Sequence, residues 1–278
     1  MKVFKTKSKL IDYLNNNRNE KSVAFVPTMG ALHSGHLKLI EESKKKCAIT
    51  ICSIFINPTQ FNQSEDFHRY PNTLNLDLEK LQRLNCNIVY IPTVDDLYAK
   101  GEGAKKFDFG SLTREMEGKS RPGHFNGVAT IVEKFFTIIN PTKAFFGQKD
   151  LQQLQIVKAL VKKMNAQIEI ISISTIREKN GLAKSSRNKL LSLKEKKKAA
   201  LIYTCLNYCM KNKKAGISEL KTYIKNQFKK QKDLKLQYIE FINLKNMLPI
   251  QTWKEKNQNA ICIAASINGI RLIDNIIL

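Results

Sequence analysis

The chain has 278 residues, of which 42% are hydrophobic and 26% charged, and 47 basic against 24 acidic residues give a formal net charge of +23. This composition is typical of a globular protein with one large or two ordinary domains, and it excludes a wholly disordered chain. No run of about 18 uncharged apolar residues occurs, which argues against a membrane-spanning helix. The first residues lack the apolar core of a secretory signal. We therefore expect a cytoplasmic protein with no membrane partner.

The positive charge suggests nucleic acid as one class of partner. Most of the basic residues are lysines, however, whereas contacts to base edges and phosphates favour the arginine fork. The lysines gather in runs such as 194–198 and 229–232, which are typical of solvated helix faces. We therefore expect no nucleic-acid partner. A basic nucleic-acid-binding protein stays open as an alternative, which a steep salt dependence of RNA binding would support.

The six cysteines match neither the spacing of a zinc site nor a disulfide framework. Most of them lie in apolar segments, as Cys52 and Cys262 do. We expect free thiols buried in a reducing compartment.

Short apolar segments alternate with longer amphipathic ones through the first 175 residues. Strands are expected at 22–27, 48–56, 87–92, 144–146 and 168–174, and helices from the loop after residue 27 to about 46 and at 73–85, 127–139 and 151–164. Strands that are apolar on both faces and alternate with helices predict a parallel sheet covered by helices. The fold class is therefore α/β, with a Rossmann-like, doubly wound parallel sheet that binds ligands beyond the carboxyl ends of its strands.

The pattern changes after about residue 175. Two lysine-rich helical segments are expected at 193–211 and 218–230, and two strand-like segments at 237–244 and 260–268. This order predicts a smaller α+β domain. We expect the domains to cover residues 1–175 and 176–278.

The loop after the first strand carries two histidines in the segment Pro27-Thr-Met-Gly-Ala-Leu-His-Ser-Gly-His36. His33 and His36 stand at a helix N-terminus, where free N–H groups and the helix dipole attract phosphate. Imidazolium groups there could bind triphosphate oxygens and stabilise charge that develops on the phosphorus. A metal-binding pair and two core histidines are the alternatives. The position directly after a strand favours nucleotide binding.

A second basic segment, Gly181-Leu-Ala-Lys-Ser-Ser-Arg-Asn188, lies near the expected domain boundary. Two hydroxyls between Lys184 and Arg187 could clamp a phosphate. Taken alone, the segment could equally be a solvated turn or a helix N-cap. Combined with the upstream H-x-G-H, it is similar to the two-part arrangement of class I aminoacyl-tRNA synthetases and nucleotidyltransferases, which use the α-phosphate of ATP.

Five segments together resemble the pantothenate synthetase (pantoate–β-alanine ligase) family, within the HxGH nucleotidyltransferase-like superfamily. They are residues 26–36, 53–61, 121–128, 145–154 and 181–188, and the ending Arg271-Leu-Ile-Asp-Asn275 is also similar. The resemblance implies an ATP-dependent ligase that joins (R)-pantoate to β-alanine through a pantoyl-adenylate intermediate and releases AMP and diphosphate. The product, pantothenate, leads toward coenzyme A. The resemblance also implies Mg²⁺, a homodimer, and a C-terminal domain that closes over the ATP site.

Matching positions carry the family's site residues onto this chain. The resemblance implies that ATP contacts Met29, Gly30, Ala31, Leu32, His33, Ser34, Gly35, His36, Gly147, Gln148, Lys149, Asp150, Ile176, Lys184, Ser185, Ser186 and Arg187. It makes His36 a proton donor, and we count His33 and Lys149 with it as catalytic. Gln60 matches the contact to both pantoate and β-alanine, and Gln153 the second contact to pantoate. No metal ligand can be assigned.

Some positions have no assigned chemistry or depart from the commonest family pattern. Gln148 and Asn180 stand where acids are frequent, and Lys184 stands where Met or Leu is frequent and adds charge beside the triphosphate. The turn from Arg121 to His124 is either a ligand contact or only a structured turn. Carboxylates that could reach Mg²⁺ through water, or serve as helix-face and capping groups, are Asp77, Glu79, Asp95 and Asp96.

A second enzyme class stays open, namely a nucleotidyltransferase or aminoacyl-adenylate enzyme with another acceptor. Gln60 and Gln153 argue against it, because side-chain amides can donate to a carboxylate and accept from a hydroxyl and therefore suit a small polar acid.

Overall fold

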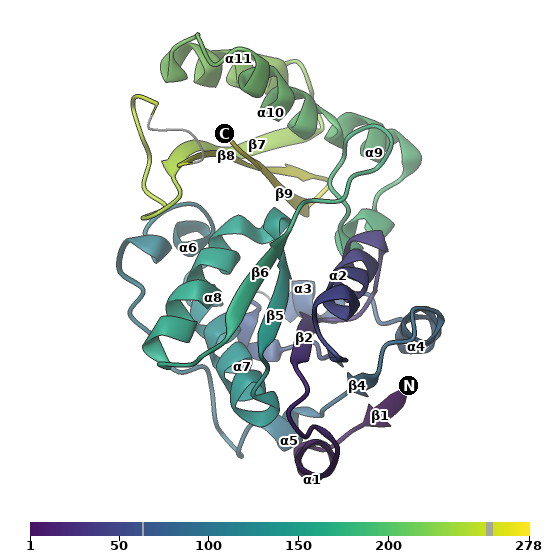
Figure 1. Cartoon of the computed structure of the whole chain (residues 1–278). Coiled ribbons are helices and arrows are strands. Elements are labelled where there is room, and N and C mark those ends of the chain that lie inside the picture. The colour runs from purple at the N-terminus through teal and green to yellow at the C-terminus, as the bar shows by residue number, and fades with distance from the viewer. Residues whose placement is uncertain (63, 254–257) are drawn as a thin grey trace. The chain divides into compact units, whose positions relative to one another are not determined.

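The computed structural model describes residues 1–62, 64–253 and 258–278. Within these residues the chain forms two compact units (Figure 1). The first unit comprises Met1–Phe109, Arg121–Gln148 and Gln153–Ser174, and the second comprises Gly110–Ser120, Lys149–Gln152 and Thr175–Leu278. The second unit thus includes two short segments from within residues 1–175. That the second domain closes over ATP stays a prediction.

The first unit is built on a parallel sheet, which confirms the predicted fold class. Over the described residues its strands are β1 (Lys2–Phe4), β2 (Val23–Thr28), β3 (Ile49–Ile54), β4 (Ile88–Tyr90), β5 (Lys143–Gly147) and β6 (Glu169–Ile173). They lie in the order β1-β4-β3-β2-β5-β6. The order therefore reverses between β2 and β5, and a doubly wound sheet places its ligand at such a reversal.

Helices cover both faces of this sheet because its central strands are apolar on both sides. The helices that belong wholly or mainly to the first unit are α1 (Lys7–Asn17), α2 (Ser34–Lys46), α3 (Ser64–His68), α4 (Leu74–Arg83), α5 (Val94–Leu97), α7 (His124–Ile139) and α8 (Leu151–Lys163). Successive residues of a strand point to opposite faces. Accordingly, Val26 of β2 shares a buried cluster with Leu39 of α2, whereas the Phe25 ring packs edge-on against Phe135 of α7. Figure 1 shows α2 and α7 on either side of β2.

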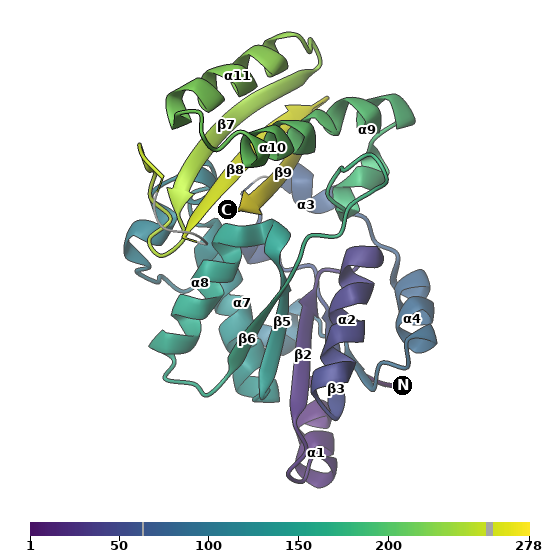
Figure 2. The ribbon, with the colours of Figure 1, turned by 45° about the horizontal axis from the view of Figure 1, so that its top comes forward.

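The second unit carries an antiparallel sheet with helices packed on it. Its strands in the described range are β7 (Leu234–Asn243), β8 (Asn259–Ile267) and β9 (Ile270–Ile277), and its helices are α6 (Met116–Ser120), α9 (Leu193–Ala199), α10 (Leu201–Lys211) and α11 (Ile217–Lys229). Figure 2 shows α10 and α11 lying over this sheet. Apolar side chains from both helices and all three strands form its core.

Several elements differ from those expected from the sequence. β1 and α1 come before the first predicted strand, and the predicted helix at 193–211 is two helices that meet at Ala200. The last residues form β9, which a tight turn at Asn268-Gly269 pairs with β8. Both turn residues have positive φ, 47° and 78°, as an Asn-Gly hairpin turn requires. The Asn-Gly pair was the sequence signal for this hairpin.

Two expectations from composition can be compared with the structure. Among the described residues no helix combines the length and the apolar character needed to cross a bilayer. All six cysteines are free thiols, and all but the half-exposed Cys47 are buried, as predicted.

Candidate active site

The candidate site lies at the carboxyl ends of adjacent strands in the first unit. The H-x-G-H segment follows β2, the Asn-Pro-Thr-Gln segment follows β3, and Gly147 is the last residue of β5. β2 lies between β3 and β5 in the sheet. Segments separated by up to about a hundred residues therefore converge at the reversal of strand order, where the fold is expected to bind its ligand.

The two histidines of the loop cap helix α2. His33 is the N-cap residue, and its Nδ1 accepts the backbone N–H of Gly35 at 3.1 Å. Nδ1 of His36 accepts the backbone N–H of His33 at 3.3 Å, and the two rings stack with centroids 4.0 Å apart. A neutral imidazole that accepts at Nδ1 carries its proton on Nε2. The capping box therefore sets both rings as Nε2–H donors, whereas the sequence suggested imidazolium groups.

Asp77 of α4 holds the backbone of the same loop. The side chain of Asp77 is fully buried, and its two oxygens accept the N–H groups of Ala31 and Leu32 at 2.7 and 2.8 Å. Gly30 and Ala31 have positive φ angles of 77° and 51°, a conformation that costs energy for a residue with a side chain. The carboxylate stabilises this turn of the backbone. Asp77 is therefore a ligand of the protein backbone rather than an open metal contact.

The sequence contained a signal for this role. Asp77 lies on the apolar face of its helix with Leu74, Leu78 and Leu81. A carboxylate on a buried face must be paired. Thr73 donates its hydroxyl to Asp77 at 3.1 Å, and Nζ of Lys80 lies 3.8 Å from it.

Gln60 ends the short 3₁₀ helix η1 (Pro58–Gln60) that follows β3, and its side chain contacts the histidine loop. The residue is only 9% exposed. Its Nε2 lies 2.6 Å from Sδ of Met29, and its Oε1 accepts from Nδ2 of Asn57 at 3.4 Å. Asn57 is held in turn by the hydroxyl of Tyr98, which donates to its Oδ1 at 2.8 Å. The structure therefore brings together the predicted ATP loop and the predicted contact to the small acids.

Lys149 and Asp150 belong to the second unit, in the 3₁₀ helix η3 (Gln148–Asp150). Nζ of Lys149 pairs with Oδ1 of Asp150 at 3.0 Å, and the Lys149 side chain is 18% exposed. The backbone carbonyl of Lys149 accepts Nδ2 of Asn275, from β9, at 2.7 Å. The end of the chain, which resembles the family in sequence, thus holds the lysine that we expect on the phosphates.

The basic segment of the second unit forms a compact turn. Ser185 caps the 3₁₀ helix η4 (Ser186–Leu190), and its hydroxyl accepts the N–H of Arg187 at 3.3 Å. The N–H of Lys184 donates to the carbonyl of Ile176 at 2.9 Å. Nζ of Lys184 pairs with Glu178 at 3.0 Å. An acid therefore balances the charge that Lys184 adds, and the N-cap that the sequence offered as an alternative is present.

The adjacent glutamines of α8 have different surroundings. Gln152 is 5% exposed and belongs to the second unit, where its amide accepts from the N–H of Glu117 and donates to the carbonyls of Leu112 and Glu115. Gln153 belongs to the first unit and is half-buried. Gln152 therefore has a structural role, and Gln153 stays the candidate substrate contact.

The other acidic candidates for Mg²⁺ lie in ordinary protein surroundings. Asp96 accepts the N–H of Lys7 and the hydroxyl of Tyr90, and Glu79 is a largely exposed helix-face residue beside Arg83. Over the described residues no group of three or more His, Cys, Asp or Glu side chains could hold a metal ion.

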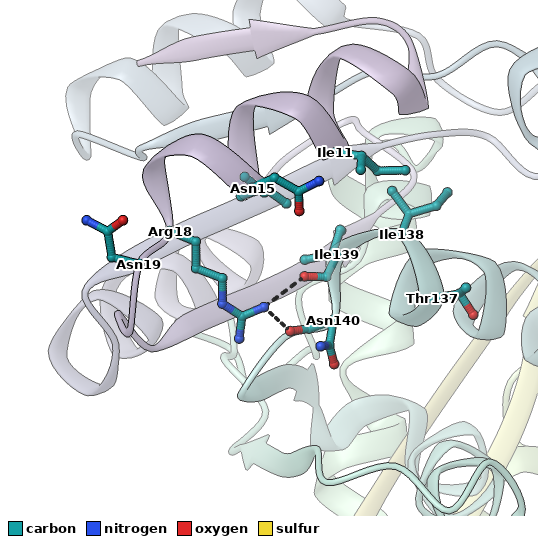
Figure 3. Close-up of a pocket in the computed structure, with 9 residues that line it drawn as sticks. Ile11, Asn15, Arg18, Asn19, Thr137, Ile138, Ile139 and Asn140 are labelled. Atoms are coloured by element: carbon teal, nitrogen blue, oxygen red, sulfur yellow. Dashed lines mark hydrogen bonds between the residues drawn. The ribbon is translucent and has the colours of Figure 1, made fainter.

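A hollow of about 410 Å³ lies between α1 and α7 (Figure 3). Arg18 points toward the end of α7, and its Nη1 donates to the carbonyls of Asn140 and Ile139 at 2.6 and 3.5 Å. The guanidinium thereby caps the C-terminus of this helix. The chain enters β2 and β5 just after these residues. The hollow is therefore at the amino ends of the strands and is separate from the candidate site.

Comparisons with known proteins agree with the motifs. Residues 2–277 match the family described as Pantoate-beta-alanine ligase. The chain is 46% identical over 266 residues to the pantothenate synthetase of Flavobacterium psychrophilum, with 93% of each chain covered. It is 43% identical over 281 residues to that of Christiangramia forsetii, with 100% of this chain and 99% of the other covered.

Solved structures of the same family are similar to the whole chain. The pantothenate synthetase of Thermus thermophilus superposes with a TM-score of 0.93 at 34% identity and 99% coverage of both chains. The pantoate-beta-alanine ligase of Francisella tularensis, solved with beta-gamma ATP and beta-alanine, superposes with a TM-score of 0.84 at 35% identity. That match covers 100% of this chain and 97% of the other.

Proposed function

The chain belongs to the pantoate–β-alanine ligase family and is a ligase, and from this premise we propose how its own residues condense pantoate with β-alanine at the expense of ATP. A carboxylate oxygen of pantoate attacks the α-phosphorus of ATP, and diphosphate leaves. The amine of β-alanine then attacks the acyl carbon of pantoyl adenylate, loses a proton, and displaces AMP. Adenylation is needed because a carboxylate oxygen is a poor leaving group and AMP is a good one.

The H-x-G-H loop is proposed to bind the phosphates during the first step. The helix N-terminus of α2 supplies a positive dipole end, and the capping box sets Nε2 of His33 and His36 as hydrogen donors. Donors held in position before the reaction stabilise developing negative charge without reorganising. A neutral Nε2–H group donates a hydrogen bond to a phosphate oxygen, whereas the proton donor that the family resemblance implies at His36 requires the imidazolium form, in which Nδ1 no longer accepts the N–H of His33.

Lys149 and the basic turn are proposed to supply the remaining phosphate contacts. Lys149 provides a point charge, Arg187 a fork for two oxygens, and the hydroxyls of Ser185 and Ser186 neutral donors. The carbonyl of Asn188 accepts the N–H of Leu191, the residue that caps the end of η4. The lysine-rich helix faces are not needed for this step.

The glutamines are proposed to bind the small acids. Gln60 lies beside Met29 of the histidine loop, so a pantoate bound by its amide would stand next to the proposed phosphate site. Gln153 is the second pantoate contact, and Gln60 also contacts β-alanine. Positioning of the reactants, rather than a covalent enzyme intermediate, then carries the rate enhancement.

Mg²⁺ is proposed to enter with the ATP phosphates. The donor set supports this, because Mg²⁺ needs only one or two carboxylates when substrate phosphates and water complete its shell. Asp150 is the carboxylate that adjoins Lys149, and its side chain is 44% exposed. When bound, the cation neutralises charge on the triphosphate. We also propose a cytoplasmic homodimer, as the family resemblance implies, to be tested by light scattering and cell fractionation.

The observation that carries the proposal is the contact between Gln60 and the histidine loop at the reversal of strand order. Purified protein is incubated with ATP and pantoate labelled with ¹⁸O in its carboxylate. Without β-alanine, we expect diphosphate release that is limited to about one turnover. After β-alanine is added, we expect ¹⁸O to be transferred into AMP. Label in inorganic phosphate, or diphosphate release that ignores pantoate, would contradict the adenylate route.

A further inference from the structure

The turn from Arg121 to His124, to which the sequence assigned no chemistry, lies against the backbone of Gln60 in the first unit. His124 is 7% exposed and begins helix α7. Its Nδ1 is 2.7 Å from the backbone oxygen of Gln60, and Nη2 of Arg121 is 3.4 Å from the same oxygen. Nη1 of Arg121 is 3.0 Å from Nε2 of His124. These three groups form a connected set of hydrogen bonds around one carbonyl.

The partners determine where the proton of His124 lies. A guanidinium has only donors, so Nε2 of His124 accepts from Arg121. A carbonyl oxygen has only acceptor sites, so Nδ1 of His124 donates to Gln60. Both contacts require the same neutral tautomer, with the proton on Nδ1. This tautomer is opposite to the one that the capping box imposes on His33 and His36.

The helix that carries His124 also packs closely on the segment that carries Gln60. A Cβ atom on Gly127 would come within 2.2 Å of the backbone oxygen of Thr59, a distance that no side chain could occupy. Nδ2 of Asn57 donates to the carbonyl of Gly127 at 3.1 Å. Close backbone contact and hydrogen bonds therefore join the first turn of α7 to the Asn-Pro-Thr-Gln segment.

We propose that His124 and Arg121 are positioning residues that set the orientation of Gln60 toward the small acids and do not themselves bind substrate. The inference rests on the proposed function, because Gln60 has this role only if its amide binds pantoate. Arg121 sets the tautomer of His124, and His124 holds the backbone carbonyl of Gln60 in place by a hydrogen bond. The position of that carbonyl sets the backbone orientation from which the side chain of Gln60 extends. Two successive hydrogen bonds thus give the turn from Arg121 to His124 a role.

The kinetic test uses His124→Phe, which keeps the ring volume but has no donor, and His124→Asn, whose Nδ2 can occupy the position of Nδ1. Loss of one neutral hydrogen bond corresponds to about a three- to tenfold change in an equilibrium constant. We expect His124→Phe to raise the KM for pantoate by about that factor with the KM for ATP unchanged, and His124→Asn to restore much of it. His68→Phe, at an exposed histidine of α3, is the matched control and should change neither.

A second measurement does not depend on activity. Because the chain has four histidines, ¹⁵N-labelled imidazoles can be resolved by NMR in the free wild-type protein. We expect the His124 signal to show a protonated Nδ1, and Arg121→Met to shift it toward a mixture of tautomers. If His124→Phe does not fold, Arg121→Met also serves for the kinetic test.

The outcomes separate the two ideas. Wild-type protein that releases no AMP when it is given ATP, pantoate and β-alanine would overturn the proposed function, whatever the NMR result. Active wild-type protein with a proton on Nε2 of His124, or a folded His124→Phe protein with an unchanged KM for pantoate, would overturn the positioning role alone. Equal increases of the KM values for pantoate and ATP would also overturn it, because they would indicate a general loss of structure.

Discussion

Replacing Asp77 by Asn tests whether one buried carboxylate holds the H-x-G-H loop. The carboxylate accepts two backbone N–H groups, from Ala31 and Leu32, at 2.7 and 2.8 Å. An amide of the same shape has one oxygen, so one of these N–H groups would face an NH₂ group and lose its acceptor. Nζ of Lys80, at 3.8 Å, would lose a partner too, but its side chain is 32% exposed, so solvent screening makes that loss small.

The expected magnitude follows from the lost hydrogen bond. A hydrogen bond to a charged group contributes about 1.5–3 kcal/mol. The apparent affinity for ATP scales with the fraction of molecules that hold the loop in its binding geometry. The KM for ATP should therefore rise by about 10- to 150-fold, while the KM for pantoate changes much less.

The assay is diphosphate release with ATP varied at saturating pantoate, and circular dichroism confirms that each variant is folded. Glu79→Gln is the matched control. It removes the same charge at a position two residues from Asp77, where the side chain of Glu79 is 60% exposed. A folded Asp77→Asn protein with a KM for ATP within twofold of wild type would refute the reasoning. Rescue of Asp77→Asn by excess Mg²⁺ would refute it differently, by showing that Asp77 is a metal contact.

Three other predictions concern catalysis, thiol ionisation and stability. His36→Ala should lower diphosphate release by about 10²- to 10³-fold, the usual effect of removing one preorganised donor, and near-normal turnover in a folded variant would contradict the role. Burial raises the pKa of the Cys86 thiol from 9.0 to about 11. The other thiols except Cys47 are buried too, so at pH 8 a disulfide reagent should label at most Cys47 quickly. Because the folded state keeps the Cys86 proton to a higher pH than the unfolded state does, the contribution of this thiol to folding stability is complete below about pH 9 and declines as the pH rises through about 11. Melting temperatures measured from pH 8 to 11 should therefore fall, and a rise over this range would contradict the prediction. Glu117→Gln should lower the free energy of unfolding by about 3–5 kcal/mol, because Glu117 is only 8% exposed and accepts from Nη1 and Nη2 of Arg271 at 2.5 and 2.7 Å; a urea midpoint equal to wild type would contradict this.

The amino-acid sequence by itself determined the class of fold and the place of the nucleotide loop. Runs such as residues 22–27 and 48–56 are apolar on both faces, which only a sheet covered on both sides can bury. The H-x-G-H segment directly follows such a run, so its position at a strand's carboxyl end and a helix's N-terminus follows from local order alone. The same is true of the Asn-Gly pair before β9, because its turn depends on two adjacent residues. These features depend on residues close together in the chain.

Only the tertiary structure decided what the isolated polar residues do. By its sequence Asp77 could be a metal contact or a helix-face acid, whereas in the fold its two oxygens accept the N–H groups of Ala31 and Leu32, 46 and 45 residues away. His124 acquires its role from a carbonyl 64 residues away, and Gln152 differs from Gln153 through a backbone N–H 35 residues away. A carboxylate, an imidazole or an amide can satisfy its hydrogen bonds in many ways. The order of strands and the packing of helices decide which partner such a side chain takes. Neither can be predicted from the residues next to it in the sequence.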